Sequence, residues 1–305
     1  MTGHVIKVFG RYYTVLSEGS AVNSVLRGKM KMGITDNFSN PVAVGDIVEF
    51  EVNEEGLGII SRVHERRNVF TRKDGVRSRE DLIACNLDQI IVVQAFDSPR
   101  LNLRFADRIV VRGGKGGVPV VLCVNKLDLA LEGETEYIDS YYKGSGVSSV
   151  YVCAQTGEGM EELRKLLDKK RTLFVGYSGV GKSTLLNKMY PGLDLRTSDV
   201  SGSTGKGRHT TTNVNLVVLP DGTELIDTPG VREFGLVDID PNVLGNYFAD
   251  FRKASEKCRF RPCSHDHEPG CEVKRLTEKG KIHEERYISY LNILYSIQEN
   301  LKNMY

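Results

Sequence analysis

The chain has 305 residues, of which 40% are apolar, and its 41 basic and 40 acidic residues leave a net charge of +1. This length favours two or three domains, and the near-neutral charge gives no global sign of a polyanionic partner, so nucleic-acid contacts have to come from local patches. No apolar run approaches the ~20 residues needed to cross a bilayer, and the N-terminus shows no signal-peptide pattern, so we expect a monomeric, cytoplasmic protein without membrane contact.

The first 70 residues alternate short apolar runs with turn residues, at 5–8, 12–16, 30–34, 47–52 and 57–63. Five short strands of this kind predict a small antiparallel barrel, for which the OB fold is the commonest candidate. Such barrels frequently hold RNA or single strands, and a barrel with a purely structural role is the alternative. We assign residues 1–70 to this domain.

A basic run follows the barrel. Between positions 62 and 79 the sequence has seven basic residues and two acidic ones, hence a local net charge of +5. One interpretation is a solvated linker, which we place at residues 71–80, because charge runs are often no more than an exposed segment. The other is a surface that contacts a phosphate backbone beside the barrel.

From residue 88 the pattern changes to apolar runs rich in β-branched residues, at 89–93, 118–124, 147–152 and 172–175, each separated by room for a helix. This alternation predicts a parallel α/β domain. Two further strands are expected at 214–219 and 224–226 before the chain leaves this domain. We assign residues 81–236 to it.

The run 118–124 ends in the motif Asn125-Lys126-Leu127-Asp128. A carboxylate at Asp128 can accept hydrogen bonds from the N1–H and the exocyclic amino group of guanine, which adenine does not offer, and Asn125 can bond the base edge and the protein backbone. A surface turn could carry the same four residues by chance. Because they stand at the carboxyl end of a predicted strand in a chain that also has a phosphate loop, we expect all four to bind a guanine nucleotide.

The next predicted strand, 147–152, is followed by Cys153-Ala154-Gln155 and an amphipathic helix at 160–167. In small GTPases a Ser-Ala-Lys turn at this point offers a backbone N–H to guanine O6. Only Ala154 agrees with that turn, and we retain it as a nucleotide contact.

Residues 176–183 read Gly-Tyr-Ser-Gly-Val-Gly-Lys-Ser, the phosphate-loop pattern of Gly, four free positions and Gly-Lys-Ser. A predicted strand precedes them, and we expect a helix to open at Thr184. Backbone N–H groups of such a loop surround the phosphates, Lys182 reaches the β- and γ-phosphates, and Ser183 offers its hydroxyl to Mg²⁺. The expected nucleotide contacts are Gly176, Tyr177, Ser178, Gly179, Val180, Gly181, Lys182, Ser183 and Thr184.

Residues 199–212 are rich in Gly, Ser and Thr, as expected of a first switch, in which one Thr binds Mg²⁺ while the γ-phosphate is present. Thr211 is the favoured ligand and Thr210 the alternative; a plain polar surface loop would look the same.

The motif Asp227-Thr228-Pro229-Gly230 follows the strand predicted at 224–226. Asp227 can hold Mg²⁺ through water, and the Gly230 N–H can sense the γ-phosphate. Val231 stands where Ras-like proteins carry the Gln that orients the attacking water, and valine cannot do so. His209 is the nearest polar candidate, with a solvated loop histidine as the alternative.

The order of these motifs is unusual, because the guanine motif at 125 precedes the phosphate loop at 176. Such an order indicates a circular permutation, which is possible where the termini of the parent fold lie close together. The chain then leaves the domain directly after the second switch, so that the C-terminal residues are attached to the part that moves.

This C-terminal part contains Cys258, Cys263, His265 and Cys271, three thiols and one imidazole within 14 residues. The set suits a closed, tetrahedral structural zinc site, and on spacing alone His267 competes as a ligand. A helix with an apolar stripe through Tyr287, Leu291, Leu294 and Leu301 is expected at 282–301, in a mostly helical domain of residues 237–305. A basic strip, either an RNA contact or a solvated face, is formed by Arg252, Lys253, Lys257, Arg259 and Arg261.

The barrel, the permuted order, the stretch Gly207-Arg208-His209-Thr210-Thr211-Thr212 and the Cys-Cys-His-Cys set together resemble the ribosome small subunit-dependent GTPase family, RsgA, also called YjeQ. The resemblance covers essentially the whole chain. It implies an OB domain, a circularly permuted G domain and a zinc-binding domain, with action late in maturation of the bacterial 30S subunit, contacts to 16S rRNA, and GTP hydrolysis stimulated by that subunit. It also assigns one zinc ion to Cys258, Cys263, His265 and Cys271, and a catalytic role to His209.

The sequence as a whole therefore predicts a GTPase with one structural Zn²⁺, and with Mg²⁺ accompanying GTP and GDP. Two other classes are open. One is an RNA-binding structural factor in which nucleotide only stabilises the fold. The other is an ATP-dependent P-loop kinase or transporter ATPase, which the motif at 125–128 disfavours.

Overall fold

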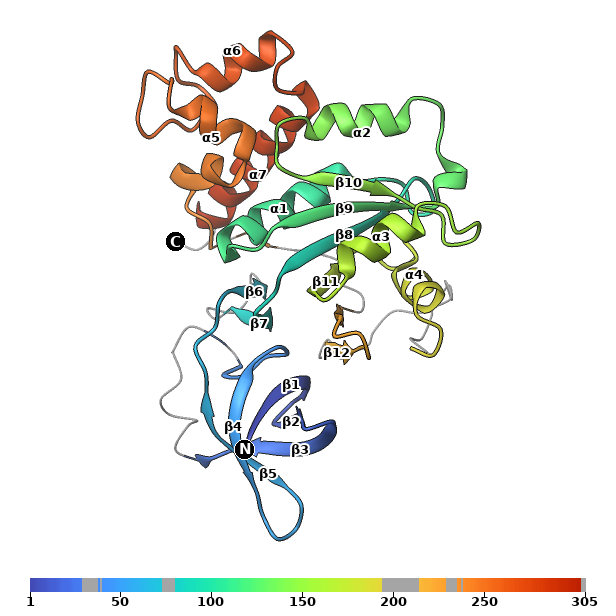
Figure 1. The fold of residues 1–305 in the computed structure, drawn as a ribbon. Helices are drawn as coiled ribbons and strands as arrows, with labels where there is room; N and C mark the ends of the chain where they lie inside the picture. The colour runs from blue at the N-terminus through green and yellow to red at the C-terminus, as the bar shows by residue number, and fades with distance from the viewer. Residues whose placement is uncertain are drawn as a thin grey trace, which may run out of the picture.

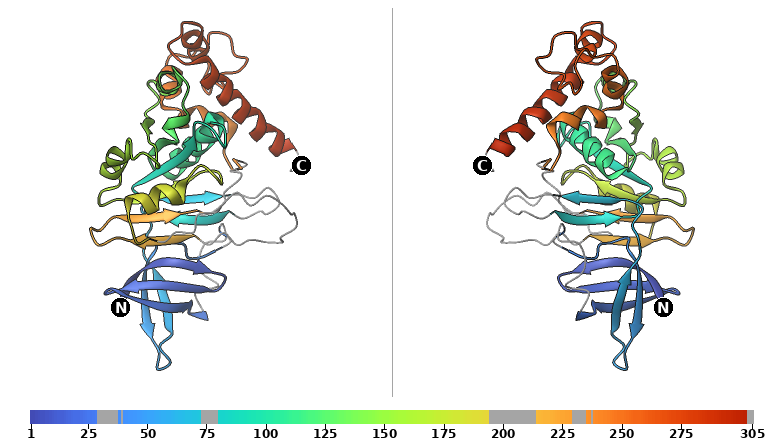
Figure 2. Two further views of the ribbon diagram at one scale, coloured as in Figure 1. Left: turned by 90° about the vertical axis from the view of Figure 1, so that its right-hand side faces the viewer. Right: turned by 90° about the vertical axis from the view of Figure 1, so that its left-hand side faces the viewer.

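The computed structural model describes residues 1–28, 38, 40–72, 80–193, 214–228, 235–236 and 238–302. Figure 1 shows three parts stacked along one direction: a β-barrel that contains the N-terminus, a central sheet with helices on its faces, and a group of helices at the C-terminal end. Figure 2 shows that the last helix begins at the end of the stack farthest from the barrel and slants outward to one side of it. None of the described helices has the length and apolar character needed to cross a membrane.

Five strands form the barrel. They are β1 (Thr2–Phe9), β2 (Tyr12–Ser17), β3 (Ser20–Leu26), β4 (Ile47–Val52) and β5 (Gly58–Val63). Pairing runs β1-β2-β3-β5-β4 and returns to β1, and β3 and β5 are parallel. Buried positions alternate with half-buried ones along most of β2 and β4, so that Val15, Val48 and Phe50 point into the barrel core. The closed five-stranded barrel expected from the sequence is confirmed.

One barrel strand differs from the prediction. The run at 30–34 lies outside the described residues, and the sequence analysis missed β3. The reason is Ser24, a fully buried polar residue at an inward position of β3. Ser24 pairs with Gly58 of β5, and a Cβ on Gly58 would come within 2.2 Å of the Ser24 hydroxyl oxygen. Two small residues are needed where these strands meet, and they interrupt the apolar alternation.

The central sheet has the strand order β10-β9-β8-β11-β13-β12, and all of these strands are parallel except β12. Every residue of β8, β9 and β11 is buried, which explains their nearly continuous apolar sequences. The predicted parallel α/β architecture is confirmed. The strands are β8 (Gln89–Ala95), β9 (Val120–Asn125), β10 (Ser148–Tyr151), β11 (Arg171–Val175), β12 (Asn215–Val218) and β13 (Glu224–Asp227).

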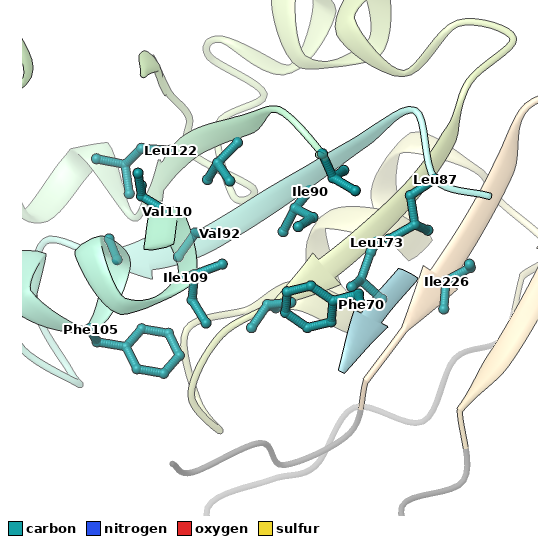
Figure 3. Packing of buried hydrophobic residues seen from close by; sticks show 14 of the residues in the cluster. Phe70, Leu87, Ile90, Val92, Phe105, Ile109, Val110, Leu122, Leu173 and Ile226 are labelled. Carbon is teal, nitrogen blue, oxygen red and sulfur yellow. The ribbon is translucent and has the colours of Figure 1, made fainter. Parts of the chain in front are cut away.

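Helices cover both faces of this sheet. On one face lie α1 (Leu103–Gly116) and α2 (Glu134–Tyr142), and on the other lie α3 (Met160–Leu167) and α4 (Lys182–Met189). Figure 3 shows Ile109 and Val110 of α1 beside Val92 of β8. The two separate apolar clusters hold the sheet from both sides and fix the strand ends that carry the predicted site.

The basic run after the barrel is not a free surface in its described part. Strands β6 (Val69–Arg72) and β7 (Asp81–Cys85) form an antiparallel hairpin, and Phe70 enters the core below α1. Each of the four described arginines of this run has a carboxylate partner: Arg62 with Glu49 at 3.4 Å, Arg66 with Asp46 at 2.7 Å, Arg67 with Asp88 at 2.6 Å and Arg72 with Asp81 at 3.4 Å. These four arginines therefore have carboxylate partners within the protein, Arg62 and Arg67 at exposed positions, and the two interpretations of the run stay predictions. Its remaining basic residues lie outside the described part.

The barrel is joined directly to the central sheet. Strand β1 pairs with β12 through Lys7 and Asn215. At the start of β11, Arg171 donates from Nη1 to the Gly45 carbonyl of the barrel over 2.8 Å, and it also forms an ion pair with Glu224 of β13. The strand that leads into the phosphate loop is therefore fixed to the barrel at its other end.

The C-terminal part is mostly helical, as the sequence predicts. It comprises η3 (Pro241–Tyr247), α5 (Ala249–Ser255), α6 (Glu272–Glu278) and α7 (Glu284–Lys302), and its core includes Val111 of α1. All four residues of the predicted apolar stripe of the last helix contact this core: Leu294 is buried, and Tyr287, Leu291 and Leu301 pack at its edge. The deepest positions of α7 are Tyr290, Ile293, Leu294 and Ile297.

Candidate functional site

The loop predicted to bind phosphate joins β11 to α4. A Cβ on Gly176 would lie 2.3 Å from the Val93 carbonyl oxygen, and one on Gly181 would lie 2.3 Å from the Asn125 amide nitrogen. Gly181 also has a φ of 92°, a conformation that side chains rarely adopt. Glycine is therefore required at both ends of the loop. Helix α4 begins at Lys182, two residues before the expected start, so Lys182 and Ser183 lie in its first turn.

Lys182 is buried and folds back over the loop. Its Nζ donates to the Gly176 carbonyl over 2.8 Å and to the Tyr177 carbonyl over 3.1 Å. Burial lowers the pKa of Lys182, and the negative charge of Asp227 opposes that shift. The ammonium group thus sits inside the loop, where its charge is poorly solvated and available for an anion.

Asp227 lies at the end of β13, next to the phosphate-loop strand, and pairs in register with Phe174. Burial raises the pKa of Asp227, and the charge of Lys182 opposes the rise. Within the described residues, the Asp227 Oδ1 atom is buried without a hydrogen-bond partner. Thr228, the next residue, donates to the Phe174 carbonyl over 2.8 Å and holds this strand end in place. An unpaired buried carboxylate oxygen is a suitable ligand for a hard cation such as Mg²⁺.

Asn125 connects three segments that are far apart in the sequence. Its Nδ2 donates to the Val180 carbonyl of the phosphate loop over 2.9 Å, and its Oδ1 accepts from the Ala154 N–H at 3.2 Å. Asn125 is 2% exposed, so both ends of its amide are satisfied inside the protein. The predicted guanine motif, Ala154 and the phosphate loop are thus brought to one edge of the sheet.

The other three residues of the motif lie on the same edge. Lys126 has a left-handed backbone with a φ of 60°, and its Nζ donates to the Ser98 carbonyl. Leu127 donates its N–H to the Val152 carbonyl over 3.1 Å. Asp128 lies in the short helix η2 (Leu127–Leu129), exposed at the surface, and its Oδ1 accepts a hydrogen bond from the Cys153 thiol over 2.9 Å.

Cys153 is a functional candidate that the sequence analysis passed over. Compared with a Ser-Ala-Lys turn, it counts as a mismatch, and only Ala154 was retained. A thiol can nevertheless donate a hydrogen bond from the position of a serine hydroxyl. The similarity between a cysteine thiol and a serine hydroxyl as hydrogen-bond donors could have identified Cys153 from the sequence.

The predicted switch residues are not all placed. His209, Thr210, Thr211, Gly230 and Val231 lie outside the described residues. Their assigned roles stay predictions.

The four expected metal ligands come together in the C-terminal part. The sulfur atoms of Cys258, Cys263 and Cys271 and a ring nitrogen of His265 all lie within 4.8 Å of one another. The Cys271 sulfur is 3.4 Å from His265 Nδ1, and the Cys258 sulfur is 3.8 Å from it. His267, the competing ligand, points into solvent with 81% of its side chain exposed. The cluster could hold a zinc ion, and His265 rather than His267 completes it.

The surroundings of the cluster orient the imidazole. His265 Nε2 lies 3.0 Å from the Ser255 hydroxyl, which itself donates to the Phe251 carbonyl over 2.8 Å. Because the hydroxyl proton is used, Nε2 must carry the imidazole proton, which leaves Nδ1 free to bind a metal. Two tyrosines of α7 fasten the loop, since Tyr287 donates to the His265 carbonyl and Tyr290 to the Ser264 carbonyl.

Comparisons with known proteins cover nearly the whole chain. A family model described as RsgA GTPase matches residues 63–237, and one described as RsgA N-terminal domain matches residues 2–60. The small ribosomal subunit biogenesis GTPase RsgA of Chlorobaculum parvum is 41% identical over 98% of this chain and 99% of its own length. The protein of the same name from Bacteroides fragilis is 38% identical over 98% of each chain.

Two solved structures share the fold. YjeQ from Thermotoga maritima has a TM-score of 0.79 at 33% identity, and the match covers 97% of this chain and 98% of that one. YloQ, described as a circularly permuted GTPase, has a TM-score of 0.72 at 28% identity, with 98% of this chain and 95% of that one covered.

Proposed function

The chain belongs to the RsgA GTPase family, and we propose that it hydrolyses GTP to GDP and phosphate in the biogenesis of the small ribosomal subunit. The observation that carries this proposal is Asn125, whose amide joins the phosphate loop to the loop after β10. A guanine-reading motif tied to a phosphate loop by its own side chain is the arrangement that a guanine nucleotide requires at its base and its phosphates.

In the proposed complex the base lies against residues 125–128 and Ala154, and the phosphates lie in the loop of residues 176–184. Lys182 exchanges the Gly176 and Tyr177 carbonyls for phosphate oxygens, which offer a full negative charge in place of two dipoles. Asp128 selects guanine by accepting from its N1–H and amino groups.

A magnesium ion would be held by Ser183, Asp227 and Thr211, with Gly230 next to the γ-phosphate. Its chemistry is to neutralise charge on the phosphate oxygens as the bond to the γ-phosphate breaks. The unpaired Oδ1 of Asp227 supports this assignment, because an ion beside it would satisfy a buried acceptor.

Hydrolysis needs a group that orients the attacking water. Val231 cannot do this, and we assign the task to His209 in the first switch. A water-orienting group on a separate loop is poorly organised until a partner fixes it, so we expect slow turnover by the isolated chain and faster turnover on the small subunit.

The C-terminal cluster would hold one structural Zn²⁺ through Cys258, Cys263, His265 and Cys271. All four ligand positions come from the protein, which leaves no open position for catalysis.

For contacts to the ribosome we propose 16S rRNA as the partner of the basic strip, namely Arg252, Lys253, Lys257, Arg259 and Arg261. All five side chains belong to exposed residues, and among the described residues none has a carboxylate within 4.0 Å. The arginines after the barrel, in contrast, are paired. Phe260 is 42% exposed within the strip, and the Arg259 guanidinium lies 5.7 Å from its ring centroid. Unpaired cations beside an exposed aromatic ring suit phosphates and an unstacked base.

Nucleotide selectivity tests the enzyme assignment. Labelled GDP bound to the purified chain should be displaced by GTP and not by an equal excess of ATP, and Lys182→Ala should abolish hydrolysis. Displacement by ATP would favour a P-loop kinase or transporter ATPase. If Lys182→Ala lost hydrolysis but kept an unchanged cycle of binding to and release from ribosomes, the chain would be an RNA-binding structural factor.

A further inference from the structure

The segment around α2 carries an unbalanced charge. Residues 127–142 contain five acidic residues and no Lys, Arg or His, a local net charge of −5 in a chain whose total is +1. Glu132, Glu136 and Asp139 are exposed, and among the described residues none of these three carboxylates has a basic partner within 4.0 Å. Their charges are therefore not neutralised within the described part of the protein.

An exposed leucine precedes these carboxylates. Leu131 is 73% exposed, yet its backbone is fixed at the start of α2. The Leu131 N–H donates to Glu134 Oε2 over 2.9 Å, and the Glu134 N–H donates to the Leu131 carbonyl over 3.2 Å. An apolar side chain presented from a fixed backbone loses little conformational freedom when a partner covers it, so Leu131 is suited to a contact with another molecule.

Tyr137 of α2 connects this segment to an open pocket of about 270 Å³. Figure 1 shows α2 beside α7, at the end of the molecule away from the barrel. The apolar part of the pocket wall comes from Phe96, Leu101, Leu103, Tyr137 and Tyr141, and the two arginines and two glutamates on the wall balance in charge. The pocket is therefore suited to an uncharged, apolar side chain of a partner.

We propose that this face of α2 is a docking site for a basic segment of a protein of the small ribosomal subunit. The α2 surface, as we call it, consists of Leu131, Glu132, Glu136, Tyr137 and Asp139. Its unpaired carboxylates attract Lys and Arg side chains, and Leu131 with the pocket at Tyr137 offers contact to an apolar side chain of the same segment. The inference rests on the proposed action of this chain on the small subunit.

The charge of the α2 surface argues against RNA as its partner. A ribosomal subunit offers two kinds of surface, the phosphates of its RNA and the side chains of its proteins. Carboxylates without neighbouring cations repel phosphates, whereas the basic strip of residues 252–261 attracts them. The two surfaces of this chain therefore differ in sign, and a protein segment rich in Lys or Arg is the partner that the α2 surface fits.

Charge reversal tests the sign of the partner, with the full chain, a non-hydrolysable GTP analogue and purified small subunits. Glu132→Lys combined with Glu136→Lys should raise the Kd for the subunit by about three- to tenfold, because two attractions become repulsions. Leu131→Ala should raise this Kd by about three- to fivefold, because apolar contact is lost. Glu54→Lys combined with Glu55→Lys makes the same change of charge on the exposed turn between β4 and β5 and should not weaken binding.

The outcomes are distinct. Weaker binding of both α2-surface variants beside an unweakened control supports the proposal. Tighter binding of the lysine variant would identify RNA as the neighbour of the α2 surface, unchanged binding would leave this surface in solvent, and an equal loss in the control would reduce the effect to net charge; each of these results overturns the proposal.

GDP binding by every variant, measured in parallel, reports an intact fold. Glu132→Gln combined with Glu136→Gln replaces the lysine variant if the latter does not bind GDP, and it should weaken subunit binding in the same direction but by less. If the unmodified chain bound GTP but no small subunits, the proposed function itself would fail.

Discussion

Arg286 of α7 donates from Nη1 to Asp107 Oδ1 of α1 over 2.7 Å, and both side chains are fully buried. The same guanidinium donates from Nε to Asp250 of α5 over 2.7 Å, and the Tyr141 hydroxyl of α2 donates to the other oxygen of Asp107. The guanidinium carbon of Arg286 also lies 4.9 Å from the ring centroid of Phe248. One arginine thus joins the C-terminal helices to both helices on one face of the central sheet.

A second connection stands where the chain enters the C-terminal part. Arg112 of α1 donates from both terminal nitrogens to the Asp238 carboxylate, each over 2.7 Å, and Lys115 also pairs with Asp238. The sequence suggested that everything after the second switch is attached to the part that moves. The structure shows that from Asp238 onward the chain is also held by α1. A switch motion that shifts the metal cluster must therefore either break the contacts of Asp238 with Arg112 and Lys115 or move α1 together with them.

The buried arginine gives a first prediction. Arg286→Met leaves Asp107 and Asp250 as buried carboxylates without their partner, and removal of one member of a buried pair costs about 3–5 kcal/mol. We expect a clear drop in the denaturant midpoint of the full chain. Arg275→Met is the control, because Arg275 is an exposed residue that pairs with Glu272 of the same helix, and its loss should not shift the midpoint measurably. Equal effects of the two variants would argue against the role given to Arg286.

Asp238 gives a prediction about pH. Burial alone would raise the pKa of Asp238, but the hydrogen bonds and charges of Arg112 and Lys115 outweigh it and hold the pKa well below its ordinary 3.8. A carboxyl group whose pKa is lower in the folded state stabilises the protein above its unfolded pKa, and this contribution fades as the pH falls toward the folded pKa.

Asp238→Asn should therefore be less stable than the unmodified chain at neutral pH. The difference in free energy of unfolding between the two proteins should be constant down to about pH 5. It should narrow below about pH 4, where the carboxyl group of Asp238 becomes protonated in the unfolded chain. Urea unfolding across this range measures it. A gap that widened toward acid would contradict the assigned sign.

The metal cluster is tested by its two histidines. His265→Ala should lose the bound zinc and lower the melting temperature, because the cluster organises a short loop that α7 clamps through Tyr287 and Tyr290. His267→Ala should retain one zinc per chain, since this side chain lies in solvent. Zinc content after dialysis and the melting curve report both effects. Loss of zinc from the His267 variant alone would reverse the assignment.

The guanine motif is tested by exchanging the base. Asp128→Asn replaces an acceptor by a donor at the position that should read the 2-amino group, so affinity should shift from GDP toward XDP, whose base carries a carbonyl there. A loss of about tenfold or more for GDP is expected, because an acceptor facing two donors is replaced by an amide. Leu129→Ala, at an exposed neighbour that makes no assigned contact, should bind GDP normally.

The sequence was sufficient where a local pattern has one physical solution. The glycines of the phosphate loop are required by the close Val93 carbonyl at Gly176 and by the positive φ and the nearby Asn125 side chain at Gly181. Three cysteines with a nearby histidine indicate a metal site, although their spacing alone left His265 and His267 as alternatives. The apolar strands of the central sheet are buried on both faces, and their nearly continuous apolar sequences therefore predicted buried parallel strands correctly.

The sequence was insufficient where a polar residue is buried by partners from distant segments. No sequence pattern marks Arg286 and Asp107 as a buried pair, because their pairing joins residues 179 positions apart. Ser24 hid a strand because it must be small where β3 packs against Gly58 of β5. Arg66 looked like part of a free basic run, yet it pairs with Asp46, which is fully buried. Such pairings depend on the fold and leave no periodic signal.

The most direct measurement of the central claim is GTP hydrolysis by the purified chain with and without purified small ribosomal subunits, with Lys182→Ala as the blank. We predict slow hydrolysis by the chain alone, several-fold or greater acceleration at saturating subunits, and no activity above background in the Lys182 variant. Hydrolysis that stayed the same at saturating subunits, or that persisted in the Lys182 variant, would contradict it.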